Sequence, residues 1–64
     1  MKRAGLDIGS TTVKAAVIGE NDELLYSQYR RHFSDIRKTV FDIISELGEH
    51  FKGERMMIAV TGSG

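Results

Sequence analysis

One acidic residue, one basic residue and several small or hydroxyl residues lie within a short segment near the start of the chain. They are Asp7, Gly9, Ser10, Thr11, Thr12 and Lys14. A glycine lets the backbone come close to a ligand, and the amides that follow it could point together at an anion. Hydroxyl groups add further donors, and a lysine adds a compact positive charge. This segment therefore predicts a phosphate-binding turn.

Asp7 needs a different role, because a carboxylate repels a phosphate. It suits a magnesium ion, which prefers carboxylate and water oxygens and often accompanies nucleotide phosphates. The segment is not a Walker loop, since it lacks the G-x-x-x-x-G-K-[ST] spacing and no helix directly follows Gly9. The same residues also suit an ordinary Gly-Ser hairpin with a solvated Asp7, and the short pattern alone favours neither interpretation.

Alternating apolar residues predict the strands around this turn. Residues 3–8 and 12–18 are short, partly β-branched and bounded by turn residues, which predicts two antiparallel strands. The polar residues 19–23 predict a second turn. Residues 24–32 predict a third strand, and its basic character suits the edge of a sheet.

The end of the third strand carries Arg30, Arg31 and His32. One interpretation is a contact surface for an anion or a partner protein. The other, which we favour, is a solvated edge with His32 near the start of the next loop.

A helix is predicted from about residue 35 to residue 49 or 51. Ser34 suits the N-cap, and Asp35 places a negative charge at the positive end of the helix dipole. Gly48 and Gly53 are candidate stops. Apolar residues at helical spacing form one stripe, namely Ile36, Val40, Ile43, Ile44, Leu47 and Phe51. Phe51 is accordingly expected in the core, and His50 on the surface.

Residues 56–60 form a continuous apolar run, the pattern of a strand buried on both faces in a parallel sheet. A crossover helix before it makes pairing beside the first strand natural. Residues 61–64 would then lie beyond its carboxyl end, where open α/β sheets bind their ligands. Gly62 and Ser63 are therefore candidate ligand contacts, although a plain Gly-Ser loop fits equally well.

Composition limits the chain to one small α/β domain at most. It has 64 residues, of which 41% are hydrophobic and 28% charged, and nine basic side chains balance nine acidic ones. This balance gives no argument for nucleic acid or an anionic membrane as a partner. With no cysteine there is neither a disulfide nor a cysteine-ligated metal within the chain. No signal peptide or membrane span is apparent, so the expected location is the cytoplasm.

The run Asp-Ile-Gly-Ser-Thr-Thr-Val-Lys at residues 7–14 resembles the first phosphate motif of the superfamily of actin, sugar kinases and heat-shock-chaperone ATPases. The resemblance implies that the hairpin holds the β- and γ-phosphates of ATP or ADP, and that Asp7 holds Mg²⁺, typically through water. Lys14 stands at the spacing of a lysine in actin. The order β-β-β-α-β resembles the opening of the ribonuclease-H-like domain of this superfamily.

Residues 25–37 and the ending at residues 59–64 are similar to the ATPase activases of 2-hydroxyacyl-CoA dehydratases. This resemblance covers nearly the whole chain. It implies an ATP-driven electron transfer to a dehydratase partner, from a [4Fe-4S] cluster held by cysteines of an activase homodimer. Those cysteines would lie downstream, so residues 1–64 are expected to be a partial N-terminal ATPase domain that is inactive alone. A strand that is buried on both faces should not be the last element, which also favours a fragment.

Two other functions stay open. A small-molecule kinase of the same superfamily would use the same hairpin, with residues 61–63 lining the substrate cleft. A non-enzymatic interaction module would use an unpaired strand edge, but it would leave the phosphate hairpin unexplained.

Overall fold

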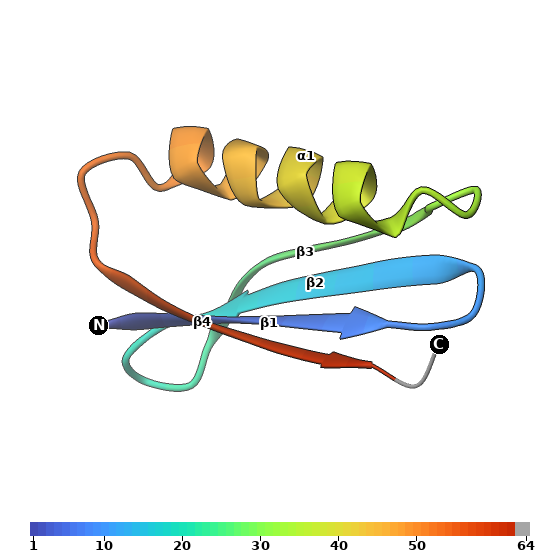
Figure 1. Ribbon diagram of the computed structural model, residues 1–64. Helices are drawn as coiled ribbons and strands as arrows, with labels where there is room; N and C mark the ends of the chain where they lie inside the picture. The colour runs from blue at the N-terminus through green and yellow to red at the C-terminus, as the bar shows by residue number, and fades with distance from the viewer. Residues whose placement is uncertain (63–64) are drawn as a thin grey trace.

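The structure, a computed structural model, describes residues 1–62 as one sheet covered on one face by a helix (Figure 1). The elements in chain order are β1 (Lys2–Ile8), β2 (Thr12–Ile18), β3 (Leu24–Arg31), α1 (Ile36–His50) and β4 (Met56–Gly62). The predicted order of three strands, a helix and a fourth strand is confirmed, with boundaries within two residues of those expected from the sequence.

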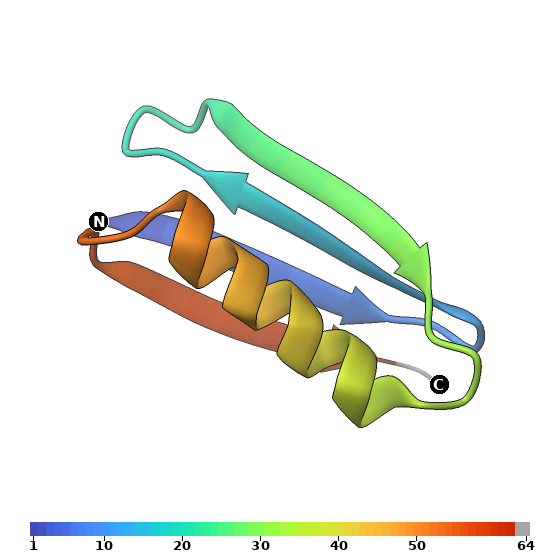
Figure 2. The ribbon, with the colours of Figure 1, turned by 90° about the horizontal axis from the view of Figure 1, so that it is seen from above.

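The sheet is mixed, with strand order β3-β2-β1-β4 (Figure 2). β1 and β3 both pair antiparallel with β2, and β4 pairs parallel with β1. The pairing of the last strand beside the first, expected for a crossover connection, is confirmed. β3 occupies an edge, as its basic sequence predicted. The turns between β1 and β2 and after β3 therefore meet at one end of the sheet.

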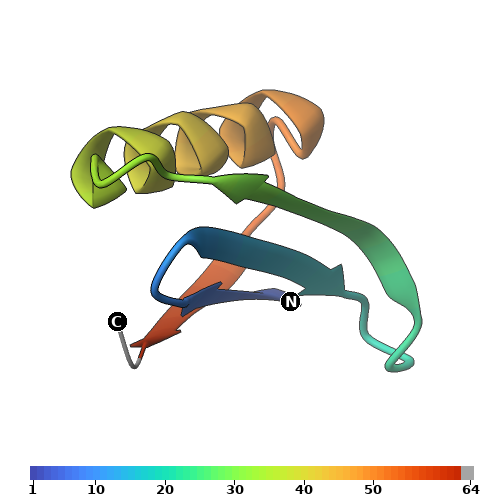
Figure 3. The same cartoon turned by 90° about the vertical axis from the view of Figure 1, so that its right-hand side faces the viewer.

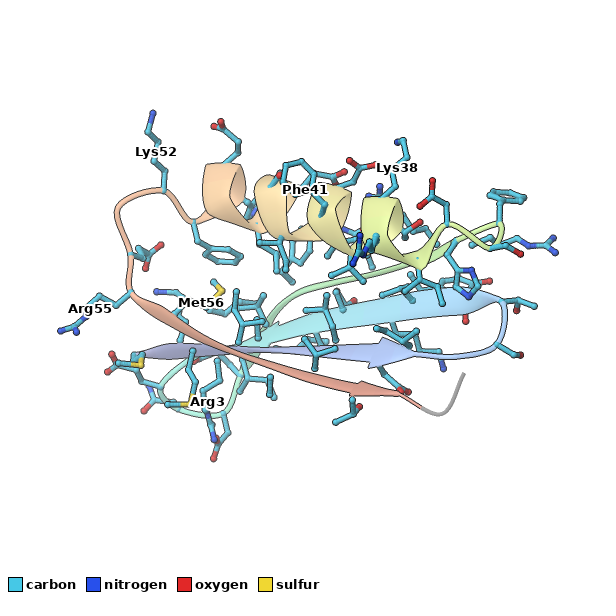
Figure 4. The ribbon with its side chains drawn as sticks, in the orientation of Figure 1. Arg3, Lys38, Phe41, Lys52, Arg55 and Met56 are labelled. Carbon is cyan, nitrogen blue, oxygen red and sulfur yellow. The ribbon has the colours of Figure 1, made fainter. Side chains whose placement is uncertain are left out.

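The core lies between α1 and the face of the sheet beneath it (Figure 3). Alternate residues of the two central strands point into it, and the helix contributes one stripe. Its buried apolar members are Ala4, Leu6, Val13, Ala15, Val17, Ile43, Leu47 and Phe51. The other face of the sheet carries no helix among residues 1–62. In Figure 4, Lys38 and Lys52 point away from the sheet on the helix side, whereas Arg3 lies on the opposite face.

β4 differs from the prediction of a strand buried on both faces. Met57, Ile58 and Val60 are 59%, 41% and 52% exposed. Met57 is opposite Arg3, on the face without a helix, whereas Ile58 and Val60 lie on the helix side. They are exposed because β4 is an edge strand with a neighbour on one side only. Ile44, a member of the predicted helical stripe, is also 37% exposed beside this edge. The apolar run correctly predicted parallel pairing but not the burial that usually accompanies it.

The helix begins one residue later than predicted. Asp35, not Ser34, is the N-cap, and its Oδ1 accepts a hydrogen bond from the Lys38 amide at 3.2 Å. Ser34 has a φ of 66° and belongs to the preceding turn. Serine and aspartate both cap helices well, and the left-handed backbone of Ser34 leaves Asp35 as the N-cap. Within residues 1–62, no helix combines the length and the apolar character needed to cross a membrane.

The helix ends as the sequence indicated, near Gly53. Phe51 is the C-cap, and Gly53 has a left-handed φ of 84°, whereas Gly48 stays inside α1. His50 is exposed, as predicted, and its ring lies 5.0 Å from that of Tyr26 and 4.8 Å from that of Phe51.

The turn between β3 and α1 is strained. The Asp35 amide donates to the His32 carbonyl at 2.7 Å, and the two residues between them, Phe33 and Ser34, have φ values of 48° and 66°. Left-handed backbone at two consecutive non-glycine residues is unfavourable, at roughly 1–2 kcal/mol for each residue.

Replacing Ser34 by glycine is therefore expected to raise the free energy of unfolding by about 1 kcal/mol, because glycine adopts this conformation without the Cβ penalty. Urea denaturation followed by circular dichroism measures it. Ser45, exposed inside α1, is the matched control, and its replacement by glycine should cost roughly 0.5–1 kcal/mol. A loss of stability in Ser34→Gly would contradict the strain.

Three ion pairs connect β1 and the residue before it to neighbouring loops, at the end of the sheet farthest from the β1–β2 turn. They join Met1 with Glu20, Lys2 with Glu54, and Arg3 with Asp22. The N-terminal ammonium donates to Glu20 at 2.8 Å and holds the pKa of that carboxyl below its usual range. Exposed pairs of this kind contribute little to stability, and they involve none of the predicted phosphate-site residues.

Candidate phosphate-binding site

The predicted phosphate turn is a tight hairpin between β1 and β2. The Gly9 amide donates to the Thr12 carbonyl at 2.7 Å, so it is used inside the hairpin. An anion at this turn would therefore have the amides of Ser10, Thr11 and Thr12 available, but not the amide of Gly9. Ser10 and Thr11 are exposed, and Thr12 is half-buried.

Gly9 is not required by the hairpin itself. Its φ lies outside the left-handed region, and a Cβ at this position would meet only Thr12 O at 3.5 Å and Thr12 Oγ1 at 3.6 Å, which are ordinary contacts. Nothing within the described chain therefore explains why this residue lacks a side chain. The space left open adjoins the Thr12 hydroxyl, where an approaching ligand would lie.

Asp7, Lys14 and Thr61 occupy one row across three strands. Asp7 is directly opposite Lys14 in the β1–β2 pair and directly opposite Thr61 in the β1–β4 pair. Neighbouring strands lie about 4.8 Å apart, and paired residues project from the same face. This face is the one without the helix, because the alternate positions Leu6, Val13 and Val60 lie on the helix side. A carboxylate, an ammonium and a hydroxyl thus stand together beside the hairpin.

A hollow of about 420 Å³ adjoins this row on the same face. Its floor consists of small residues, including Gly5, Ala16 and Ala59, and Asp7 and Lys14 lie at its border. The arrangement places the two opposite charges at the edge of an open, largely apolar depression. Among residues 1–62, no ion pair joins Asp7 to Lys14, so the charge of each side chain is available to a ligand.

Arg30, Arg31 and His32, at the end of β3, lie in three different environments. Arg30 donates to both carboxylate oxygens of Glu46, at 2.8 and 2.9 Å, and so ties β3 to α1. Arg31 is exposed, with its guanidinium carbon 5.5 Å from the centre of the Phe33 ring. Both arginines are opposite hairpin residues in the β2–β3 pair, Arg31 opposite Thr12 and Arg30 opposite Val13. The side chain of Arg31 is exposed, as the interpretation of a solvated edge predicts, whereas that of Arg30 is half-buried against α1.

His32 is not the solvated residue predicted from the sequence, because only 5% of it is exposed. Its backbone amide donates to Thr11 O at 3.0 Å, and its Nε2 lies 3.1 Å from Gly9 O. Sequence reasoning missed this contact. The residue lies 23 positions from Gly9, and no local pattern marks a histidine that reaches a distant turn.

Gly62 was predicted in the loop after the strand, but it is the last residue of β4, which continues two residues beyond the predicted end at residue 60. It is opposite Ile8, and a Cβ on Gly62 would come within 3.1 Å of Ile8 Cβ and Ile8 O. Close packing of the two strand ends thus accounts for this glycine without a ligand. Ser63, the other predicted contact from this segment, lies outside the described residues.

The donor set fits magnesium bound with a nucleotide better than a metal bound by protein alone. Among residues 1–62, no three His, Cys, Asp or Glu side chains gather into a metal-binding group. One exposed carboxylate, Asp7, suits Mg²⁺ that keeps most of its ligands from water and phosphate. An iron–sulfur cluster does not fit, because the sequence contains no cysteine.

A scan against protein-family models and a search of curated proteins each found no match. Solved structures do match. A protein described as a 2-dehydro-3-deoxygalactonokinase from Sinorhizobium meliloti superposes with a TM-score of 0.69 at 19% identity over 94% of this chain. The Ppx/GppA family member of Aquifex aeolicus gives 0.60 at 23% identity, also over 94%.

The chain has the fold that opens actin-like ATPase domains. It spans 20% of the length of the first structure and 26% of the second. The predicted β-β-β-α-β fold is therefore confirmed, and it matches one part of a larger architecture in those proteins. At these identities the likeness concerns the fold, and the residue roles rest on the geometry described above.

Proposed function

We propose that residues 7–14 bind the β- and γ-phosphates of a magnesium-bound adenine nucleotide. The observation that carries this proposal is the pairing of Asp7 with Lys14 on one face of the sheet, directly beside a turn with three available amides. The match to kinase and Ppx/GppA structures supports a phosphate-handling role for the fold.

Each group has a distinct task in this proposal. The amides of Ser10, Thr11 and Thr12 and the ammonium of Lys14 hold phosphate oxygens, and Asp7 orients the water shell of Mg²⁺. The metal supplies charge neutralisation when it is bound. These are the positioning and electrostatic requirements of phosphoryl transfer. Among residues 1–62 we assign no base for an attacking water, and the proposal concerns binding and orientation of the phosphates.

Isothermal titration of the chain with Mg-ATP tests its independent capacity. We expect weak binding and no hydrolysis, because a nucleotide in this fold needs a second phosphate loop and an adenosine pocket that the chain does not provide. Micromolar affinity would overturn this expectation.

Gly9→Ala gives a sharper test of the site. We expect phosphate binding to fall at least about tenfold, because a methyl group would enter the space beside Thr12 Oγ1. The free energy of unfolding should change by no more than about 0.5 kcal/mol, since the added Cβ meets only ordinary contacts. Gly48→Ala, where a Cβ meets nothing within 4 Å, is the control and should leave binding unchanged. Equal binding by Gly9→Ala and the wild type would contradict the proposed position of the ligand.

For the parent protein we propose an ATP-dependent activase of a 2-hydroxyacyl-CoA dehydratase, on the resemblance of residues 25–37 to that family. The activase would be a cytoplasmic homodimer that carries the [4Fe-4S] cluster on cysteines outside residues 1–64. ATP hydrolysis by the parent would drive electron transfer to the dehydratase.

A small-molecule kinase is the second candidate, favoured by the superposition on the sugar-acid kinase structure. The parent reading frame separates the two candidates. Cluster-binding cysteines and a second Gly-rich phosphate loop downstream would support the activase. A cysteine-free continuation with a carboxylate in the substrate cleft would support the kinase instead.

A further inference from the structure

Three of the hydrogen bonds of His32 fix its ring and backbone beside the phosphate turn. The Ser34 amide lies 3.1 Å from Nδ1, and a backbone amide can only donate, so Nδ1 is the acceptor. The proton of the neutral ring is therefore on Nε2, which donates to Gly9 O at 3.1 Å. The backbone amide of His32 donates to Thr11 O at 3.0 Å.

These contacts determine where two amides of the turn point. In a planar trans peptide the carbonyl and the following N–H point in opposite directions. When His32 holds the Gly9 carbonyl, the Ser10 amide points away from the imidazole. When the backbone of His32 holds the Thr11 carbonyl, the Thr12 amide points away from β3.

The imidazole lies on the helix side of the sheet. Side chains alternate along β3, and Arg30, two residues earlier, reaches Glu46 of α1. The deep burial of His32 agrees with this placement. The Ser10 amide must then point toward the opposite face, which is the face that carries Asp7 and Lys14.

We propose that His32 is a positioning residue, whose Nε2–H holds the Gly9 carbonyl so that the Ser10 amide is aimed at the bound phosphate. The strained turn has a role in this arrangement. Left-handed backbone at Phe33 and Ser34 returns the chain so that the Ser34 amide reaches Nδ1 and selects the required tautomer. Backbone strain of this kind persists where surrounding contacts over-determine it. The inference rests on the proposed phosphate site.

Two substitutions of His32 test the two ring nitrogens separately. His32→Gln places an amide donor near the position of Nε2 and keeps the contact with Gly9 O. His32→Asn places its amide near the position of Nδ1 and cannot reach Gly9 O. We expect His32→Asn to weaken Mg-ATP binding about tenfold, as loss of a phosphate contact would, and His32→Gln to retain most of the wild-type affinity.

Thr39→Val is the control for stability. Thr39 is a second buried polar residue, 7% exposed, and its hydroxyl donates to Asp35 O at 3.0 Å, away from the hairpin. Its replacement should lower stability without changing affinity for Mg-ATP. Equal affinities in His32→Asn and His32→Gln would overturn the proposal.

Nuclear magnetic resonance tests the positioning without any nucleotide. The neutral imidazole of His32 is expected to be the Nε2–H tautomer, and the Ser10 amide resonance should move in His32→Asn but not in Thr39→Val. An Nδ1–H tautomer, or an unmoved Ser10 amide, would overturn the role of His32. If these spectra agree with expectation but the wild type does not bind phosphate, the proposed function fails and the positioning of the turn stands.

Discussion

Asp7→Asn is expected to lower the affinity for Mg-ATP by about 10- to 100-fold, which corresponds to the loss of one strong charge-assisted contact. Asparagine keeps the size and the hydrogen-bonding capacity of the side chain but removes the charge that orients Mg²⁺. Because Asp7 is exposed, the free energy of unfolding should change by no more than about 0.5 kcal/mol. Titrations with and without Mg²⁺ measure the effect, and the wild type and the variant should bind the metal-free nucleotide more similarly.

Asp22→Asn provides the matched control for Asp7→Asn. Asp22 is an exposed carboxylate in the loop between β2 and β3, where it pairs with Arg3 at the end of the sheet farthest from the hairpin. Its replacement removes the same charge and should leave nucleotide affinity unchanged. Equal losses in the two variants would show a general effect of net charge and would contradict a specific role for Asp7.

Ile43→Ala is expected to lower the free energy of unfolding by about 3 kcal/mol, within the range of roughly 2–5 kcal/mol for such truncations. Ile43 is 0% exposed and is the position at which α1 enters the core above the central strands. A chain of 64 residues buries a smaller fraction of its surface on folding than a larger domain does, so its free energy of unfolding is expected to be low. Urea denaturation should therefore show a folded baseline that is shortened or absent.

Phe41→Ala is the control for the core, since Phe41 lies on the same helix and is 69% exposed. Although Phe41→Ala removes a larger side chain than Ile43→Ala does, it should change the free energy of unfolding by no more than about 0.5 kcal/mol. A greater loss in Phe41→Ala than in Ile43→Ala would mean that α1 presents a different face to the sheet.

Local patterns in the sequence were sufficient to predict the order of the elements and the hairpin that carries the candidate site. The alternation in residues 3–8 and 12–18 predicted the β1–β2 hairpin, and the register then brings Asp7 opposite Lys14. The helical stripe predicted the burial of Ile43, Leu47 and Phe51. Each of these features depends on neighbours within a few positions, where periodicity and turn chemistry are informative.

The features that were missed depend on contacts between distant parts of the chain. His32 is buried because its ring meets Gly9, and no local signal distinguishes it from a histidine at a solvated edge. Asp35 rather than Ser34 is the N-cap, because Ser34 has left-handed backbone and belongs to the preceding turn. Val60 is exposed because its strand lies at an edge of the sheet. Composition predicts that a residue prefers burial, but the arrangement of the elements decides whether it is covered.

The proposal that the β1–β2 hairpin binds nucleotide phosphates is tested most directly by following backbone amide resonances of the whole chain during titration with Mg-ATP. Weak binding is sufficient for this measurement. The account predicts saturable shifts concentrated at Ser10, Thr11 and Thr12, with little change along α1, and a loss of these shifts in Asp7→Asn. No shift at millimolar nucleotide, or shifts centred on Tyr26 and His50, would contradict it.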